Sequence, residues 1–169
     1  ATKFLEVPVT EMMERSRAFV KVQEGCNEQC SFCIVPQTRG SSRSRDPKLV
    51  LDQVSQLLNS GYGEIVLTGV HVGDYGVDLG NGGRLLTGLM EQILEIKGVE
   101  RLRLSSIEPS TITDDLIDLM AAEPRLARHF HIPFQSGSDD VLARMKRRYT
   151  VETFDTLVER ISVRLDEFG

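Results

Sequence analysis

The sequence lacks any apolar run approaching the roughly 20 residues that are needed to cross a bilayer. It also lacks the apolar block of a secretory signal peptide, because charged side chains interrupt residues 1–17: Lys3, Glu6, Glu11, Glu14 and Arg15. From these features we expect neither a transmembrane protein nor a secreted precursor. We therefore expect a soluble protein of the cytoplasm that does not bind membranes.

Proline and glycine are too scarce for a fibrous repeat, at 6 and 14 of 169 residues. Hydrophobic residues make up 40% of the chain and charged residues 27%, which are ordinary values for a globular protein and exclude a disordered tail. The length favours one domain rather than two.

A large excess of positive charge is absent as well. The formal net charge is −5, so a nucleic acid would have to bind to a local basic patch rather than to the molecule as a whole. Two stretches could form such a patch: Arg39, Arg43 and Arg45, and the run Arg144, Lys146, Arg147 and Arg148. Each of them could equally be a solvated surface.

Cysteine is also scarce, but the three cysteines are clustered at Cys26, Cys30 and Cys33 in the spacing C-x3-C-x2-C. An odd number cannot pair fully within one chain, and nothing indicates secretion, so we expect no disulfide framework. Polar residues separate the thiols, which is typical of a loop that wraps around a metal centre.

Two kinds of metal centre suit three clustered thiols. Iron–sulfur clusters usually take four cysteine ligands, so three on one loop could hold three irons of a cubane and leave the fourth iron open to a substrate. Structural zinc sites are normally closed by four ligands, and here the fourth would come from His71, His129 or His131. These histidines could instead serve packing or hydrogen bonding.

Strand and helix patterns alternate along the rest of the chain. Strands are predicted at residues 18–23, 64–68, 101–106 and 129–135, and helices at residues 46–61, 85–96, 113–120, 139–145 and 151–168. The region 69–83 is glycine-rich and is expected to be a loop. About four alternations of strand and helix favour a parallel sheet covered by helices. Since a closed eight-fold barrel needs about 250 residues, we expect an open, incomplete β/α barrel with a final helix.

Residues with ligand-like side chains follow the predicted strands where each strand ends. They are the cysteine loop, Gly69, residues 105–108 and residues 135–138. In parallel α/β folds, binding and chemistry take place at that edge of the sheet. We therefore expect these four segments to form one site.

Longer motifs surround these segments. The cysteine loop reads Glu24-Gly25-Cys26 through Cys33 and continues into Ile34-Val35-Pro36 and Arg39-Gly40, and it is followed by LTGVHVGDYG (67–76), SSIEP (105–109), HIPFQSGSD (131–139) and MKRRYT (145–150). With these motifs, which extend from around Arg17 to Tyr149, the chain closely resembles the radical S-adenosylmethionine (SAM) methylthiotransferases. Members of that family modify tRNA or a ribosomal protein. The second and third motifs most resemble the branch that methylthiolates threonylcarbamoyladenosine beside the tRNA anticodon.

The resemblance implies the fold and the cofactors. The fold would be α/β, an incomplete (open) parallel β/α barrel of the radical SAM type with four βα units and a final helix. Cys26, Cys30 and Cys33 would bind a [4Fe–4S] cluster whose fourth iron chelates S-adenosyl-L-methionine. An electron from the cluster would cleave the sulfonium and release a 5′-deoxyadenosyl radical.

Further residues are assigned to cofactor binding by the same resemblance. Phe32 would lie near the adenine, and Thr68 and Gly69 would present backbone to the methionine amine. Glu108 and Gln135 would form hydrogen bonds with the cofactor. Each residue also has a structural interpretation, as an anchor of the loop, a turn at the end of a strand or a cap on neighbouring backbone.

Two arginines and one histidine receive weaker assignments. Arg147 and Arg148 would orient the cofactor or the substrate. His71 belongs to a family motif, but the resemblance gives it no chemical role.

Family resemblance also sets the expected domains and partners. Residues 1–17 would be a lead-in or linker and residues 18–169 a partial radical SAM core. The N-terminal domain with a second [4Fe–4S] cluster and the C-terminal RNA-binding β-barrel would be absent, so complete methylthiolation is not expected from this fragment. Partners of the full-length protein would be the tRNA anticodon region, an electron donor such as flavodoxin or ferredoxin, and a sulfur donor.

Two alternatives remain at this stage. The same chemistry could act on isopentenyladenosine in tRNA or on an aspartate of a ribosomal protein. From a different class, the chain could be a zinc-binding or RNA-binding module without catalysis.

Overall fold

The computed structural model describes Phe4 and residues 16–80 and 85–165. Its elements follow in the order β1 (Arg17–Glu24), α1 (Val35–Arg39), β2 (Arg43–Ser44), α2 (Pro47–Asn59), β3 (Glu64–Gly69), the 3-10 helix η1 (Val72–Asp74), α3 (Leu86–Leu94), β4 (Arg101–Leu104), the 3-10 helix η2 (Pro109–Thr111), α4 (Asp114–Ala122), α5 (Asp139–Arg144) and α6 (Val151–Arg164). Most of the lead-in expected at residues 1–17 lies outside the described residues, and Arg17 already belongs to β1.

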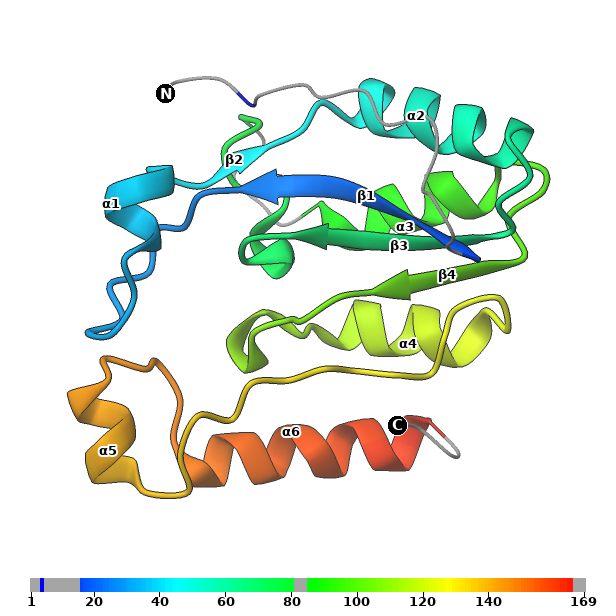
Figure 1. Cartoon of the computed structure of the whole chain (residues 1–169). Helices are drawn as coiled ribbons and strands as arrows, with labels where there is room; N and C mark the ends of the chain where they lie inside the picture. The colour runs from blue at the N-terminus through cyan, green and yellow to red at the C-terminus, as the bar shows by residue number, and fades with distance from the viewer. Residues whose placement is uncertain (1–3, 5–15, 81–84, 166–169) are drawn as a thin grey trace.

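One four-stranded sheet organises the chain, in the strand order β2-β1-β3-β4. The pairs β1·β3 and β3·β4 are parallel, as expected for an open β/α barrel, and their arrowheads all point toward the side of the molecule where α1 and α5 lie (Figure 1). The short strand β2 departs from this pattern, because it pairs antiparallel with the end of β1. The chain reverses direction through the cysteine loop and α1, so it returns beside β1 in the opposite sense.

The prediction of a strand at residues 129–135 is wrong. Within this segment the one isolated bridge is Ser106↔His131, and a second parallel bridge, Leu102↔Leu126, lies just before the segment. Between the two bridges the β4 side advances by four residues and the other side by five, so one residue interrupts the ladder. The backbone N–H of His129 donates to the carbonyl oxygen of Ala127 at 2.7 Å, in a tight turn that takes up the extra residue.

The helices begin where capping residues satisfy their first N–H groups. In α2 the Asp46 carboxylate accepts from the backbone N–H groups of Lys48 and Leu49, with Pro47 at the first helical position. In α6 the side chains of Thr150 and Thr153 form a reciprocal capping box. The predicted end of this last helix, at residue 168, lies outside the described residues, and α6 ends at Arg164.

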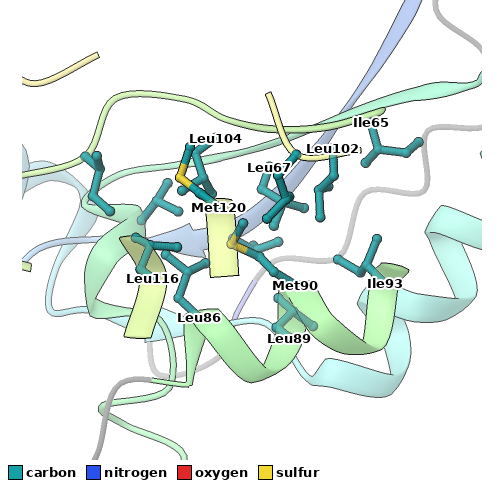
Figure 2. Packing of buried hydrophobic residues seen from close by; sticks show 14 of the residues in the cluster. Ile65, Leu67, Leu86, Leu89, Met90, Ile93, Leu102, Leu104, Leu116 and Met120 are labelled. Carbon is teal, nitrogen blue, oxygen red and sulfur yellow. The ribbon is translucent and has the colours of Figure 1, made fainter. Parts of the chain in front are cut away.

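The core lies between the sheet and the helices. Ile65, Val66 and Leu67 on β3 are buried, because this strand has neighbours on both sides and helices over it. Figure 2 shows side chains of β3 and β4 facing those of α3, with Met90 and Leu89 beneath the sheet. Burying such side chains supplies most of the free energy of folding and fixes the direction of the strands that carry the site.

A polar network ties β2 to the loop that follows β3. The Ser44 hydroxyl donates to Asp78, accepts from the backbone N–H of Gly76 at 2.8 Å, and lies 2.8 Å from Oε1 of Gln23. Beside it, the buried Tyr75 hydroxyl donates to the carbonyl oxygen of Arg45 at 2.8 Å. The network holds the chain that returns from the cysteine loop against the body of the fold.

No helix in the described part of the chain is both long and apolar enough to span a membrane.

Candidate metal and cofactor site

A cavity of about 200 Å³ lies at the C-terminal ends of the parallel strands. Its lining includes residues of all four segments expected at this edge, together with some neighbours: Cys26, Glu28, Cys30, Phe32, Cys33, Val35, Gly69, Val70, His71, Ser106, Ile107, Glu108, Pro133, Gln135 and Arg147. Residues predicted from four separate stretches of sequence therefore share one site. A larger cavity of about 440 Å³ lies beside α3, but no cysteine lines it.

The cysteine loop is held against the chain that returns toward β2. The backbone N–H of Cys26 donates to the carbonyl oxygen of Gly40 at 3.0 Å. Gly25 makes this approach possible, because its φ is +70° and a Cβ there would lie 2.1 Å from the carbonyl oxygen of Ser41. All three thiols are free, and burial raises the pKa of the Cys26 thiol although the Glu28 N–H donates to it.

The three thiols are not gathered as closely as the ligands of a single metal ion. A zinc ion with Zn–S bonds of about 2.3 Å holds its sulfur ligands within about 4.6 Å of one another. Among the described residues, the group whose donor atoms all lie within 4.8 Å of one another is Glu28, His71 and Asp74, not the three cysteines. An iron–sulfur cluster bonds each thiolate to a different iron, so three free thiols around one open cavity fit such a group.

Of the residues expected beside the cysteines, Gly69 lies at the tightest point. A Cβ on Gly69 would lie 2.5 Å from the carbonyl oxygen of Gln23, so the end of β3 can sit this close to β1 only without a side chain. Phe32 lines the cavity with 54% of its surface exposed, so it does not anchor the loop in the core. Thr68, by contrast, is not among the cavity-lining residues.

Glu108 and Arg147 form an ion pair inside the cavity. The Arg147 side chain is only 6% exposed, and its guanidinium also donates to the Sγ of Cys30 at 3.2 Å. Burial lowers the pKa of Arg147, but Glu108 and its other partners outweigh this and raise it, so the guanidinium stays charged. Gln135 lines the same cavity from the segment that precedes α5.

The two basic stretches do not form continuous exposed patches. Arg45 is buried and donates to Gln53, and Arg147 is buried in its ion pair. Arg148 remains accessible, with 70% of its side chain exposed, and its Nε lies 3.1 Å from Glu28. Arg43 is held by the carbonyl oxygens of Arg39 and Ser41.

From the sequence, His71 was a possible fourth zinc ligand or a packing or hydrogen-bonding residue, and its partners were not predicted. Its side chain is 6% exposed, Nδ1 lies 3.0 Å from the Asp74 carboxylate, and the buried Nε2 has no hydrogen-bond partner although the residue lines the cavity. Burial lowers the pKa of His71, but the Asp74, Glu108 and Glu28 carboxylates together raise it above its ordinary value. The three-residue spacing of His71 and Asp74 within one motif was the sequence signal that could have indicated their pairing.

Strained backbone concentrates around this site. Three non-glycine residues in the described part of the chain have positive φ: His71 (57°), Gln135 (68°) and Lys146 (58°). The first two line the cavity of the cysteines, and Lys146 lines a small adjoining cavity together with Cys30 and Glu108. Such conformations are found preferentially at functional sites.

Curated relatives match nearly the whole chain. It is 48% identical over 156 residues to the threonylcarbamoyladenosine tRNA methylthiotransferase MtaB of Bacillus subtilis, covering 91% of this chain and 34% of that protein. It is 40% identical over 150 residues to the tRNA-2-methylthio-N(6)-dimethylallyladenosine synthase of a Hydrogenobaculum species, covering 89% and 34% respectively. The chain thus spans about a third of the length of these relatives.

Solved structures share the fold. A radical S-adenosylmethionine methyltransferase, TsrM from Kitasatospora setae, superposes with a TM-score of 0.66 at 20% sequence identity, over 87% of this chain and 29% of that one. This similarity supports the open β/α barrel. Residues 20–165 match the Radical SAM superfamily, and because that match spans most of the chain, the protein belongs to the Radical SAM superfamily.

Proposed function

We propose that this chain is the S-adenosylmethionine-cleaving core of an enzyme that methylthiolates threonylcarbamoyladenosine beside the tRNA anticodon. One observation carries the proposal: all three cysteines line a single cavity with Gly69 and Glu108, at the C-terminal ends of parallel strands. The similarity to the Bacillus subtilis relative supports the choice of target.

The cysteines are assigned as ligands of a [4Fe–4S] cluster. Three thiolates leave one iron without a protein ligand, and that iron would be open to the amine and carboxylate of S-adenosylmethionine. When bound, the cluster would supply the electron that cleaves S-adenosylmethionine and yields a 5′-deoxyadenosyl radical. Cys26 is buried, whereas Cys30 and Cys33 are partly exposed.

The remaining lining residues would bind the organic cofactor. Gly69 lines the cavity at the end of β3 and would present its backbone to the methionine amine. Glu108 and Gln135 offer polar groups from two further segments, and the exposed ring of Phe32 offers an apolar face to the adenine. Arg148, which pairs with Glu28 and has 70% of its side chain exposed, would contact substrate.

For the full-length protein we propose further partners on the basis of the family resemblance. They are the tRNA anticodon region, an electron donor such as flavodoxin or ferredoxin, a sulfur donor and a second [4Fe–4S] cluster. Such an enzyme would act in the cytoplasm.

The test is cofactor cleavage by the anaerobically reconstituted chain. Iron, sulfide, S-adenosylmethionine and a strong reductant are supplied, and 5′-deoxyadenosine is measured. We expect product from the wild-type chain and none from Cys30→Ala, since two thiolates cannot hold the cluster. Ser31→Ala is the matched control, because this exposed side chain lies in the same loop. Tight zinc binding without a cluster would contradict the proposal.

The target is tested separately with the full-length enzyme and two tRNA substrates. Methylthiolation of tRNA carrying threonylcarbamoyladenosine, but not of tRNA carrying isopentenyladenosine, is the expected result. The reverse preference would leave the radical chemistry in place and overturn the target.

A further inference from the structure

The loop after α5 contacts the cysteine loop at three points. The backbone N–H of Ser31 donates to the carbonyl oxygen of Met145 at 3.1 Å, and Nη1 of Arg147 donates to the Sγ of Cys30 at 3.2 Å. The Nε of Arg148 lies 3.1 Å from Glu28. Residues 145–148 thus face the segment 28–31, from which they are separated by more than a hundred residues of sequence.

Arg147 is the best anchored member of this contact. Nη2 pairs with Glu108, Nε donates to the Tyr149 hydroxyl at 3.3 Å, and the guanidinium lies 5.1 Å from the centre of the Tyr149 ring. The Tyr149 hydroxyl in turn lies 2.9 Å from the carbonyl oxygens of Pro133 and Phe134. Because Glu108 holds Nη2 and Tyr149 holds Nε, the direction in which Nη1 points toward Cys30 is fixed.

We propose that Arg147 is a positioning residue for Cys30 and that its hydrogen bond tunes the metal centre that this cysteine helps to hold. The assignment of a cluster at Cys30 rests on the proposed function, whereas the contact itself does not. The family resemblance assigned Arg147 to cofactor or substrate orientation, but its closest partners lie within the chain. Through the contact with Cys30, Arg147 acts on the proposed metal centre by way of a ligand sulfur.

The effect on the centre follows from charge. A hydrogen bond from a charged donor to a ligand sulfur stabilises negative charge on that sulfur, and reduction adds negative charge to an iron–sulfur cluster. The side chain is 6% exposed, so water screens this interaction little. Arg147 therefore favours the reduced cluster and slows the departure of iron from Cys30.

The first readout uses the metal-free chain. Arg147→Met keeps an unbranched apolar side chain but removes the guanidinium and its donors. We expect amide hydrogens of residues 28–31 to exchange about tenfold faster, as the loss of one charge-assisted hydrogen bond gives. Arg101→Met is the matched control, because Arg101 is exposed at the start of β4, at the opposite edge of the sheet. It should leave this exchange unchanged. Equal exchange in all three proteins would overturn the positioning role.

The second readout uses the reconstituted chain. In Arg147→Met we expect iron to pass to a chelator about tenfold faster, the usual cost of losing an outer-shell contact. At a fixed solution potential the ratio of reduced to oxidised cluster should fall about tenfold, which is 59 mV for a one-electron couple. Arg147→Lys, which keeps the charge and part of the donor set, should recover part of both effects. The reduction potential is the chosen readout because a merely structural defect would not shift it selectively. A cluster of wild-type potential in Arg147→Met would overturn the tuning role.

The two proposals fail differently. If the wild-type chain takes up no iron, the cluster assignment fails, while the exchange comparison in the metal-free chain still decides whether Arg147 positions the cysteine loop. If the wild-type chain cleaves S-adenosylmethionine and Arg147→Met matches it in exchange, iron retention and potential, only the inference about Arg147 fails.

Discussion

The conformation of Gly25 makes a quantitative prediction about the cysteine loop. Replacing it with alanine imposes a left-handed backbone on a residue with a Cβ, which costs about 1–2 kcal/mol. The new Cβ would also lie 2.1 Å from the carbonyl oxygen of Ser41 and 2.7 Å from that of Gly40. Backbone atoms cannot rotate away as a flexible side chain can, so overpacking adds about 1–3 kcal/mol. Gly25→Ala should therefore lower the free energy of unfolding by about 2–5 kcal/mol.

Two other glycines separate the two contributions. Gly61 has a φ of +92° with nothing within 4 Å of the position that a Cβ would take, so Gly61→Ala should show only the conformational cost of about 1–2 kcal/mol. Gly88 lies inside α3 with no such neighbours and no positive φ, so Gly88→Ala should stabilise the chain by about 0.5–1 kcal/mol.

The assay is urea unfolding of the metal-free chain, followed by circular dichroism, with the change taken from the midpoint at a constant m-value. A stability of about 5–15 kcal/mol is usual for a domain, so Gly25→Ala could remove a large part of it. If Gly25→Ala proved no more destabilising than Gly61→Ala, the close approach of the cysteine loop to Ser41 would be refuted.

Three further predictions test neighbouring features. Ser44→Ala leaves the buried N–H of Gly76 without its acceptor and should cost about 1–3 kcal/mol in urea unfolding; an unchanged midpoint would show that the network does not hold β2. Because the pKa of His71 is raised above about 6.5, its protonated ring stabilises the fold at lower pH and loses this effect as the pH rises through the raised value. Asp74→Asn should therefore destabilise the chain more at about pH 5.5 than at about pH 9, and an equal loss at both would contradict the pairing. Thr150→Ala removes the capping box of α6 and should lower the thermal midpoint through a loss of about 1 kcal/mol; a control at the exposed Val163 should not.

Much of the fold could be predicted because the apolar patterns are long and clearly bounded. The strand at residues 18–23 and the helix that begins at Asp46 both carry local signals, and the structure has them as β1 and α2. The strand β2 has two residues, which is too short for any alternation to be recognised. The segment 129–135 alternates as a strand should, but its pairing with β4 depends on a register that no local pattern reports.

Some features of the candidate site could likewise be predicted from the sequence, and others depend on the folded chain. Clustered cysteines and a glycine at the end of a strand are visible as local patterns. The contact of Arg147 with Cys30 joins residues 117 positions apart, and only the folded chain brings them together. The free Nε2 of His71 is equally a property of its burial, since the sequence shows the residue but not what surrounds it.

The backbone strain around the cavity has a consequence for how the molecule opens. Holding His71, Gln135 and Lys146 in the left-handed region costs of order 1 kcal/mol or more at each position. Local unfolding releases this free energy, so it is favoured most where these residues lie. The C-terminal edge of the sheet should thus be the part of the fold with the lowest free energy of local opening, while β1 and β3 open only with global unfolding. A group that binds at this edge only when the loops are folded would stabilise the loops against local opening. The concentration of that group would then set how often the site opens.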